Sequence, residues 1–579
     1  MPHKIKVPRT YFCSPLLESN PQLFRELKGK LTTRNLVVAA ALSVLVQFLT
    51  VIYFLAELPE ASDRPIQYGS YGNALYEGAM YHTKDELGHW LVNWQVWWLD
   101  LFITLSFIGI FALLVVGTHM LVADLVRETN RGTLNFIRLS PQSAGSVLLG
   151  KILGVPILLY MAIVLLLPLH LSAGLQAHIP LGLILAFDAV VLASCGLVYC
   201  LALLWSLVNL GKSAMKSWLA AGILFFLLFS SKMILFQGYV RFDHTADSLL
   251  IFNPAIILSY LIEATPLNLG KSSHFAAVNN LSSLSFYGQT WWTNTAVGIS
   301  LIWLNLSLWT YWCWSLLKRR FHNPQGTILN KQQSYWLTAW FIFIALGFTL
   351  QQNLLVDLDG PKAIADNFIF LQVCLSLFGL GLIFALTPQR QTLHDWARYR
   401  HQQRPRSSLV RELVLGENSP AIMAIALNLV IAIIFITPSI WLILPPEQHY
   451  FIWGFVLAAT SVLFCAAIVQ LVLLTKTNKR GIWSIVTVAA LIIVPPVCLG
   501  ITDLTIYRLP EAWLITLASL AAVEQTSVGA TAWAICGQWL AITVMSLQTT
   551  RQLQRAGAST TKALMSQSVM DSNQLGSSS

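Results

Sequence analysis

The sequence predicts an all-α polytopic membrane protein with about twelve transmembrane helices and both termini in the cytoplasm. Hydrophobic residues make up 56% of the 579 residues and charged residues only 11%, whereas a soluble domain carries about 25% charged residues. The apolar residues fall into blocks of roughly 20, the length that spans the hydrocarbon core of a bilayer. Because backbone groups in lipid must pair within their own segment, these blocks are predicted to be helices.

The expected spans, taken in chain order, also predict the orientation of the chain. Most of the 36 lysines and arginines lie in the N-terminal segment, the C-terminal segment and alternate loops. Short cytoplasmic loops retain basic residues, so this distribution places both ends inside the cell. The predicted spans lie near residues 36–56, 99–122, 152–171, 181–208, 214–236, 292–316, 335–350, 367–386, 420–444, 450–475, 481–501 and 526–547.

Four regions follow from this pattern. Residues 1–35 form a cytoplasmic amphipathic segment, 36–325 a first six-helix unit, 326–550 a second six-helix module, and 551–579 a polar tail predicted to be disordered. The external loops 57–98 and 237–291 are long. The first contains a tryptophan face, typical of an interfacial aromatic belt, formed by Trp90, Trp94, Trp97 and Trp98. The second contains an apolar stretch, Ala255 to Ile262, which is too short to span and is expected to form a short helix or re-entrant element.

No catalytic or metal-binding motif is found. A nucleotide-binding loop needs the pattern G-x-x-x-x-G-K-[ST], and at the two Gly-Lys-Ser sequences, 211–213 and 270–272, the earlier glycine is replaced by Ser206 and Thr265. The twelve histidines show no metal-ligand spacing. We therefore expect no enzyme activity, no metal site and no cofactor in this chain. The positive charge is interpreted as membrane topology rather than nucleic-acid binding.

Asp188 is the main intramembrane candidate for function. It lies well inside the fourth predicted span, where an unpaired charge costs at least ~2.5 kcal/mol and often marks a transport pathway. Ionisable residues are otherwise scarce in the spans. This scarcity is unfavourable to an ion-coupled carrier, which needs titratable or coordinating groups near the middle of the membrane.

The loop after the second span carries the most informative pattern. Arg127, Glu128 and Arg131 are predicted to form a charged turn, and Gly132 to allow close backbone approach. An apolar group follows, and Ser140-Pro141 ends the element. A short helix of this kind suits docking into a groove on a soluble partner, while the alternative is an ordinary interfacial loop. The apolar group consists of Leu134, Phe136, Ile137 and Leu139.

Residues 15–325 resemble the permeases of type-2 ABC exporters. The resemblance in this loop rests on Arg127-Glu128, Gly132-Thr133-Leu134, Ser140-Pro141, Ser143 and Gly150-Lys151. The opening segment, Asn20 to Lys28, is similar to the connecting helix of that family, of the form N-P-x-x-x-R-E-L, and contributes Pro21, Arg25 and Glu26. Phe252-Asn253-Pro254, before the sixth predicted span, is similar to a third sequence feature of that permease family.

The resemblance implies a permease subunit in a bacterial inner (plasma) membrane, coupled to a separate ABC ATPase subunit that binds ATP and Mg²⁺. It also implies a homodimer or a pair with a related permease, surrounded by membrane lipid. The ATPase-coupling role is carried over to Arg127, Glu128, Arg131, Gly132, Thr133 and Leu134. Asn135 replaces the usual acid, and residues 326–550 have no counterpart, so they are interpreted as an accessory module. The alternative is a membrane scaffold or assembly protein that keeps the fold and transports nothing.

Overall fold

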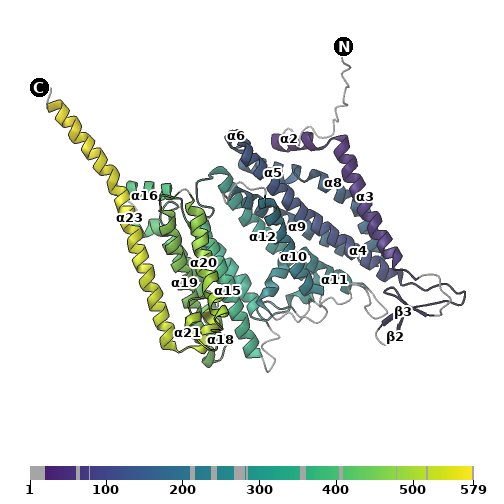
Figure 1. The fold of residues 1–579 in the computed structure, drawn as a ribbon. Coiled ribbons are helices and arrows are strands. Elements are labelled where there is room, and N and C mark those ends of the chain that lie inside the picture. The colour runs from purple at the N-terminus through teal and green to yellow at the C-terminus, as the bar shows by residue number, and fades with distance from the viewer. Residues whose placement is uncertain are drawn as a thin grey trace, which may run out of the picture. The chain divides into compact units, whose positions relative to one another are not determined.

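The computed structural model divides into two compact units (Figure 1). Unit 1 comprises Met1–Phe242, Leu249–Leu284 and Thr290–Pro324, and unit 2 comprises Asp243–Ser248, Ser285–Gln289 and Gln325–Ser579. The residues that the structure describes are 20–59, 66–76, 79–208, 215–236, 244–265, 281, 284–351, 360–402, 408–477, 479–516 and 519–576. Residues 1–19 of the predicted connecting segment lie outside this description.

Unit 1 is built mainly from long apolar helices, with shorter helices at their ends. The second predicted span is a continuous helical rod of α4, a π-helical turn η1, and α5. The hydroxyl of Tyr199, which belongs to the later helix at Leu181–Leu207, donates a 2.7 Å hydrogen bond to the backbone oxygen of Leu113 in η1. The elements are α2 (Pro21–Lys30), α3 (Thr33–Ala56), α4 (Trp94–Ile110), η1 (Phe111–Val116), α5 (Gly117–Arg131), α6 (Thr133–Leu139), α7 (Ala144–Gly154), α8 (Ile157–Gln176), α9 (Leu181–Leu207), α10 (Met215–Phe236), η3 (Pro254–Ile256), α11 (Ile257–Glu263), η5 (Trp291–Thr293) and α12 (Thr295–His322).

A small antiparallel sheet lies in the connection between α3 and α4, for which the sequence predicts only a long loop. Its order is β1-β3-β2, with β1 at Ile66–Tyr68, β2 at Ala74–Tyr76 and β3 at Ala79–Thr83. The register places Tyr68 opposite Tyr81. Such short strands lack the extended alternation that identifies a strand from sequence.

Unit 2 is also helical in the part that the structure describes. Its helices are α13 (Lys331–Thr349), α15 (Gly360–Leu386), α16 (Arg390–Gln402), α17 (Leu409–Leu415), α18 (Ile422–Ile443), η6 (Pro446–Gln448), α19 (Phe451–Leu473), α20 (Arg480–Ile501), α21 (Pro510–Trp513), α22 (Ser519–Gln525) and α23 (Val528–Gly576). Its core packs α13, α15, α18 and α19 through Ile342, Phe368, Ile436 and Phe455.

Ten helices among the described residues are long and apolar enough to cross a membrane, so the chain is a multi-pass membrane protein. They coincide with ten of the twelve predicted spans. The other two predicted spans are helical as well, but α10 is described as apolar over the shorter range Met215–Ser231, and α13 is not among the ten. The count of twelve and the orientation of the termini stay predictions.

The segment after α10 is a bent helical pair. The 3₁₀ helix η2 (Thr245–Phe252) meets Pro254–Glu263 at 95°, which makes the pair a broken span or a re-entrant element. The predicted short helix at Ala255 to Ile262 is therefore confirmed as helical. The break falls at Asn253, whose side-chain oxygen accepts a 3.0 Å hydrogen bond from the backbone N–H of Ala255.

Burial separates central spans from peripheral ones. In unit 2, 67% of the most apolar window of Pro446–Leu473 is buried, so α19 is a central helix. In unit 1, only 17% of the corresponding window of Thr33–Ala56 is buried. The open face of α3 is apolar and includes Val37, Leu42 and Phe48, as expected of a helix side that faces lipid or a further membrane subunit.

Two expectations differ from the structure. The helix α4 begins at Trp94 with Asn93 as its N-cap, so Trp90 precedes the helix and does not share its tryptophan face. The predicted disordered tail also differs, because α23 continues to Gly576. Residues 551–570 contain neither proline nor a pair of glycines, and their alanine, glutamine, leucine and methionine residues have good helix propensity. The polar composition that indicated disorder is compatible with a helix extending beyond the apolar span.

Candidate functional site

The first feature of the site is the short helix α2, which begins where the sequence predicted the connecting helix. Asn20 caps it, because its side-chain oxygen accepts a 3.1 Å hydrogen bond from the backbone N–H of Leu23. Pro21 occupies the first helical position, where its missing N–H costs nothing. Lys28 and Lys30 lie in the last turn, where their positive charges interact favourably with the negative end of the helix dipole. Figure 1 shows α2 running across the end of the long unit 1 helices.

The polar face of α2 packs on α7. Gln22 and Glu26 are buried there, while Phe24 is 47% exposed. Two glycines of α7 permit this approach: a Cβ on Gly150 would lie 2.9 Å from the Asn20 side-chain oxygen, and one on Gly154 would lie 2.6 Å from the Glu26 Cβ. Polar residues of α2 are therefore buried and an apolar residue is exposed. This arrangement is typical of an interfacial helix, which keeps an apolar side available to the membrane surface.

The centre of the site is Lys151, which lies on α7 and is 2% exposed. Its ammonium nitrogen lies 2.9 Å from a carboxylate oxygen of Glu26, 2.6 Å from one of Asp124 and 2.7 Å from one of Glu128. These four residues form what we term the Lys151 cluster. It joins α2, α5 and α7; Lys151 is 27 residues from Asp124 and 125 residues from Glu26 along the chain.

Two more cations balance the charge of the Lys151 cluster. Lys30 pairs with Glu26 at 2.9 Å and donates a 3.0 Å hydrogen bond to the backbone oxygen of Val155. Arg25, half exposed, pairs with Glu128. Three carboxylates thus face three cations. Such pairing is what allows charged side chains to be buried at all.

The protonation behaviour follows from this geometry. Burial alone would raise the pKa of Glu26, but the charges and hydrogen bonds of Lys151 and Lys30 lower it from 4.5 to about 2. Burial alone would lower the pKa of Lys151, but attraction to Asp124, Glu128 and Glu26 raises it above 10.5. Glu26 and Lys151 therefore keep their charges at neutral pH.

The three carboxylates resemble a cation site in spacing. Oxygens of Glu26, Asp124 and Glu128 lie within 4.8 Å of one another. The Lys151 ammonium lies within hydrogen-bonding distance of all three, so a positive charge from the chain itself already sits among them. We interpret the cluster as a structural junction of helices.

The helix pair α5 and α6 extends from this cluster. Gly132 separates the two helices at a φ of 75°, in the left-handed region that glycine adopts without strain. A Cβ on Gly132 would meet nothing within 4 Å, so its role is this turn and not the close backbone approach that the sequence predicted. Arg127, Glu128 and Arg131 belong to the last turns of α5 and do not form a separate charged turn.

The structure divides the predicted coupling residues into two groups. Glu128 joins the Lys151 cluster, and Leu134 is 3% exposed. The exposed group offers positive charge and polar atoms to solvent at the end of α5 and the start of α6, and consists of Arg127, Arg131 and Thr133. Only the second group is accessible to another protein.

Two large apolar side chains of α6 are strongly exposed. Phe136 is 76% exposed and Leu139 is 84% exposed. Both belong to the apolar group predicted from the sequence, in which the family resemblance assigns the coupling role to Leu134. Their exposure depends on which side of α6 faces the bundle, and a seven-residue helix has too little periodicity to show that from sequence.

A second contact ties α6 to the end of α12. The guanidinium of Arg138 lies over the ring of Phe321, 5.4 Å from its centroid. Burial, and then the nearby charge of Arg320, lower the pKa of Arg138. Through Arg138 the α6 element contacts α12, and through Glu128 the adjoining end of α5 contacts α2 and α7.

Asp188 does not belong to this site. It lies within α9, is partly buried, and shares no hydrogen bond or ion pair with the Lys151 cluster in the described residues. The residues that sequence reasoning missed are Asp124, Lys30 and the role of Lys151. Asp124 and Glu128 are four residues apart, which places them on one helix face and was the available signal.

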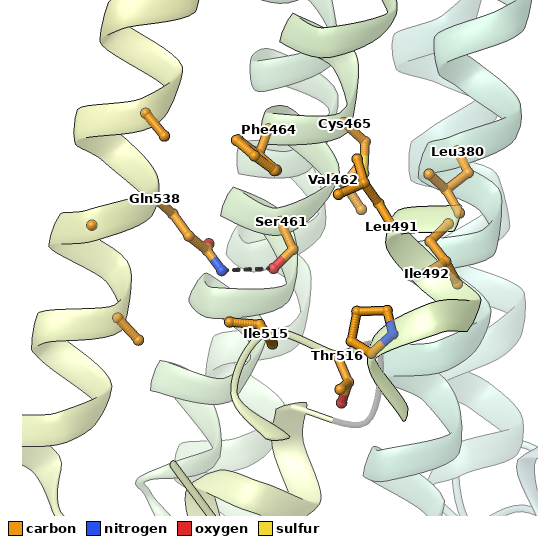
Figure 2. Close-up of a pocket in the computed structure, with 14 residues that line it drawn as sticks. Leu380, Ser461, Val462, Phe464, Cys465, Leu491, Ile492, Ile515, Thr516 and Gln538 are labelled. Atoms are coloured by element: carbon orange, nitrogen blue, oxygen red, sulfur yellow. Dashed lines mark hydrogen bonds between the residues drawn. The ribbon is translucent and has the colours of Figure 1, made fainter. Parts of the chain in front are cut away.

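Unit 2 contains a separate, mostly apolar cavity of about 410 Å³ (Figure 2). It is lined by α15, α19, α20 and α23 together with Ile515 and Thr516. Figure 2 shows its main polar feature, a 3.0 Å hydrogen bond that the Gln538 side-chain nitrogen donates to the Ser461 hydroxyl. Pro495, inside α20, also lines it. A Cβ on the adjacent Gly537 would meet nothing within 4 Å.

The fold and the site together define a multi-pass helical membrane protein whose first unit holds an exposed short helix on a buried ionic junction. Comparison of the chain with protein-family models, with curated proteins and with solved structures gives no match.

Proposed function

We propose that the chain is the membrane-spanning permease subunit of an ATP-binding-cassette exporter, with both termini cytoplasmic and the bacterial inner membrane as its location. The observation that carries the proposal is the exposure of Phe136 and Leu139 on α6. Two large apolar side chains on a polar-flanked helix are the kind of feature that docks into a groove on a soluble protein. The type-2 exporter motifs of residues 15–325 support the same reading.

In this proposal the docked partner is a separate ATPase subunit, which binds ATP and Mg²⁺. Arg127 and Arg131 are exposed near the end of α5, shortly before the docking pair in the chain, and would meet acidic groups of that partner. This chain then contributes no catalytic residue and no cofactor of its own. A homodimer, or a pair with a related permease, would present two α6 helices to two ATPase subunits.

The Lys151 cluster supplies the mechanical link. Movement of α6 would be passed to α2 and α7 through Glu128, Arg25 and Lys151, and to α12 through Arg138 and Phe321. Because packed and ion-paired helices move as bodies rather than deform continuously, a push on α6 would tilt the spans. In this way ATP-driven closure of the partner would change the access of the transport pathway.

The second candidate function is a membrane scaffold that keeps this fold and transports nothing. It is favoured by the scarcity of ionisable residues in the predicted spans, where Asp188 is the one acid well inside a span of unit 1, and by the additional six-helix module of residues 326–550. A scaffold would retain the Lys151 cluster as a structural junction and would have no ATPase subunit.

The two functions are separated by affinity purification of the tagged full-length chain in mild detergent, followed by mass spectrometry and an ATPase assay. The variant Phe136→Ser/Leu139→Ser removes the docking pair and leaves the Lys151 cluster intact. The control is Leu87→Ser, because Leu87 is 81% exposed and lies in the connection before α4. The exporter proposal expects an ATPase with the unmodified and control chains and at least about tenfold less with the double variant. Purification without any ATPase favours the scaffold.

A further inference from the structure

A basic pocket lies on unit 2, at the junction of α16 with the first residue of α20. It has a volume of about 320 Å³. Arg390, His394 and Arg398 are spaced four residues apart on α16, so they share one face of the helix. Arg480 joins them from α20, and the remaining lining residues are Gln391 and Asp395.

The pocket is held in place by the adjoining face of α16. Leu393 and Ala397 are buried there against Leu474 and Leu553, and Trp396 packs beside them. The arginines are therefore fixed relative to one another by a small hydrophobic core. This distinguishes them from a mobile run of surface charges.

The pocket has more positive charge than its own acids neutralise. Three arginines face one carboxylate, Asp395, which lies 3.5 Å from Arg398 in an exposed pair. The Nε atoms of Arg390 and Arg398 are buried and have no hydrogen-bond partner within the described residues. Burial lowers the pKa of His394, and Arg390 and Arg398 lower it further, which reports the same positive potential.

The side chains of this pocket are suited to binding a phosphate group. Guanidinium groups form paired hydrogen bonds to phosphate oxygens. Arg480 is the first residue of α20, so the positive end of this helix dipole lies at the pocket. Arg480 is also the first residue of a candidate membrane span, Arg480–Ile501, so the pocket lies where lipid headgroups are found.

We propose that this pocket binds the phosphate group of an anionic phospholipid headgroup, with Arg390, Arg398 and Arg480 as the ligands. Basic pockets beside membrane helices are known to hold such headgroups. The same chemistry would accept a soluble phosphate ester, and the experiment separates the two sources. The proposal concerns unit 2 alone and does not depend on the proposed exporter function.

The test measures binding to the purified full-length chain of short-chain phosphatidylglycerol, phosphatidylcholine and glycerol 3-phosphate. The pocket variant is Arg398→Gln/Arg480→Gln. The control is Arg411→Gln/Arg555→Gln, which removes the same charge from two exposed arginines of unit 2 outside the pocket. Gel filtration of each variant checks that it is folded, and Arg398→Lys/Arg480→Lys keeps the charge while removing the paired hydrogen bonds.

We expect phosphatidylglycerol to bind and phosphatidylcholine not to bind. Each arginine near a membrane surface contributes about a fivefold change in affinity, so the pocket variant should bind phosphatidylglycerol roughly thirtyfold more weakly than the unmodified chain. The lysine variant should also bind this lipid weakly. The control should bind it within about twofold of the unmodified chain. Glycerol 3-phosphate binding as tightly as the lipid would keep the phosphate site and assign it a soluble ligand. Equal binding by the pocket variant, or an equal loss in the control, would overturn the proposal.

Discussion

At the scale of single residues, the molecule places a lysine where three carboxylates converge. Sequence reasoning singled out Glu26 and Glu128 separately, and the structure brings both to Lys151. The contact between these residues was not predictable from the sequence, because 125 residues separate Lys151 from Glu26 and no local pattern indicates such a contact. The exposure of Phe136 beside the buried Leu134 was equally hidden, since one turn of helix decides which side chain faces the bundle.

Replacing Lys151 with methionine should destabilise unit 1 more than any exposed substitution. Methionine has a similar volume, but it leaves Glu26, Asp124 and Glu128 facing one another without their shared cation. Breaking a buried ionic cluster by removing one partner costs roughly 3–5 kcal/mol. The measurement is thermal unfolding in detergent, with Lys28→Met on the exposed side of α2 as the control. Equal unfolding temperatures for the two variants would contradict the role given to Lys151.

The stability of the same cluster should depend on pH at both extremes. The pKa of Glu26 is lowered from 4.5 to about 2, so its stabilising contribution is complete above 4.5 and is lost as the pH falls towards 2. The pKa of Lys151 is raised above 10.5, so its contribution is complete below 10.5 and is lost at still higher pH. Unfolding temperatures measured across pH should be lower for Glu26→Gln than for the unmodified chain, and they should fall less steeply as the pH is lowered. An unchanged acid limb in that variant would argue against the pairing.

At the scale of elements, apolar block length was enough to locate the helices but not their small neighbours. Within the residues that the structure describes, all twelve predicted spans are mainly helical, because a run of about 20 apolar residues has few alternatives in lipid. The sheet of β1, β2 and β3 was missed because its strands have only three to five residues. The packing of α2 on α7 was not predictable either, since it depends on Gly150 and Gly154 lying opposite a polar helix face.

The close approach of α2 and α7 predicts a contrast between two glycines. Gly154→Ala would place a Cβ 2.6 Å from the Glu26 Cβ and should displace α2, at a cost of about 1–3 kcal/mol for overpacking. A Cβ on Gly29 meets nothing within 4 Å, so Gly29→Ala should be neutral or stabilising by up to about 1 kcal/mol. Thermal unfolding and protease sensitivity of α2 report the difference. A harmless Gly154→Ala would show that α2 is not held this closely.

The cavity of unit 2 predicts a second contrast. Gly537→Ala adds a methyl group with no atom within 4 Å, and alanine favours the helix, so stability should be unchanged or slightly higher. Gly454→Ala on α19 would place a Cβ 2.1 Å from the Leu520 Cδ1 and 3.2 Å from its Cα, which should cost about 1–3 kcal/mol. Unfolding temperatures of the two variants in detergent decide the matter. A destabilised Gly537→Ala would mean that the cavity is filled.

At the scale of the whole molecule, composition alone established a multi-pass helical membrane protein, because no soluble fold accommodates so many long apolar helices. The orientation of the chain and its proposed partners rest on other features of the sequence and structure. The distribution of lysine and arginine predicts that the termini are cytoplasmic, and the exporter function rests on motifs together with the exposed α6 pair. Unit 2 has no such motif, and its cavity and basic pocket depend on side chains from several helices that the sequence does not bring together.

The measurement that tests the central proposal most directly is photocrosslinking in living cells from a photoreactive residue placed at position 136, with position 87 as the matched exposed control. Crosslinked products are identified by mass spectrometry. The exporter proposal predicts a product from position 136 that joins this chain to a protein carrying a nucleotide-binding loop, and its absence from position 87. No ATP-binding protein at position 136, or the same yield from both positions, would contradict the docking of an ATPase on α6.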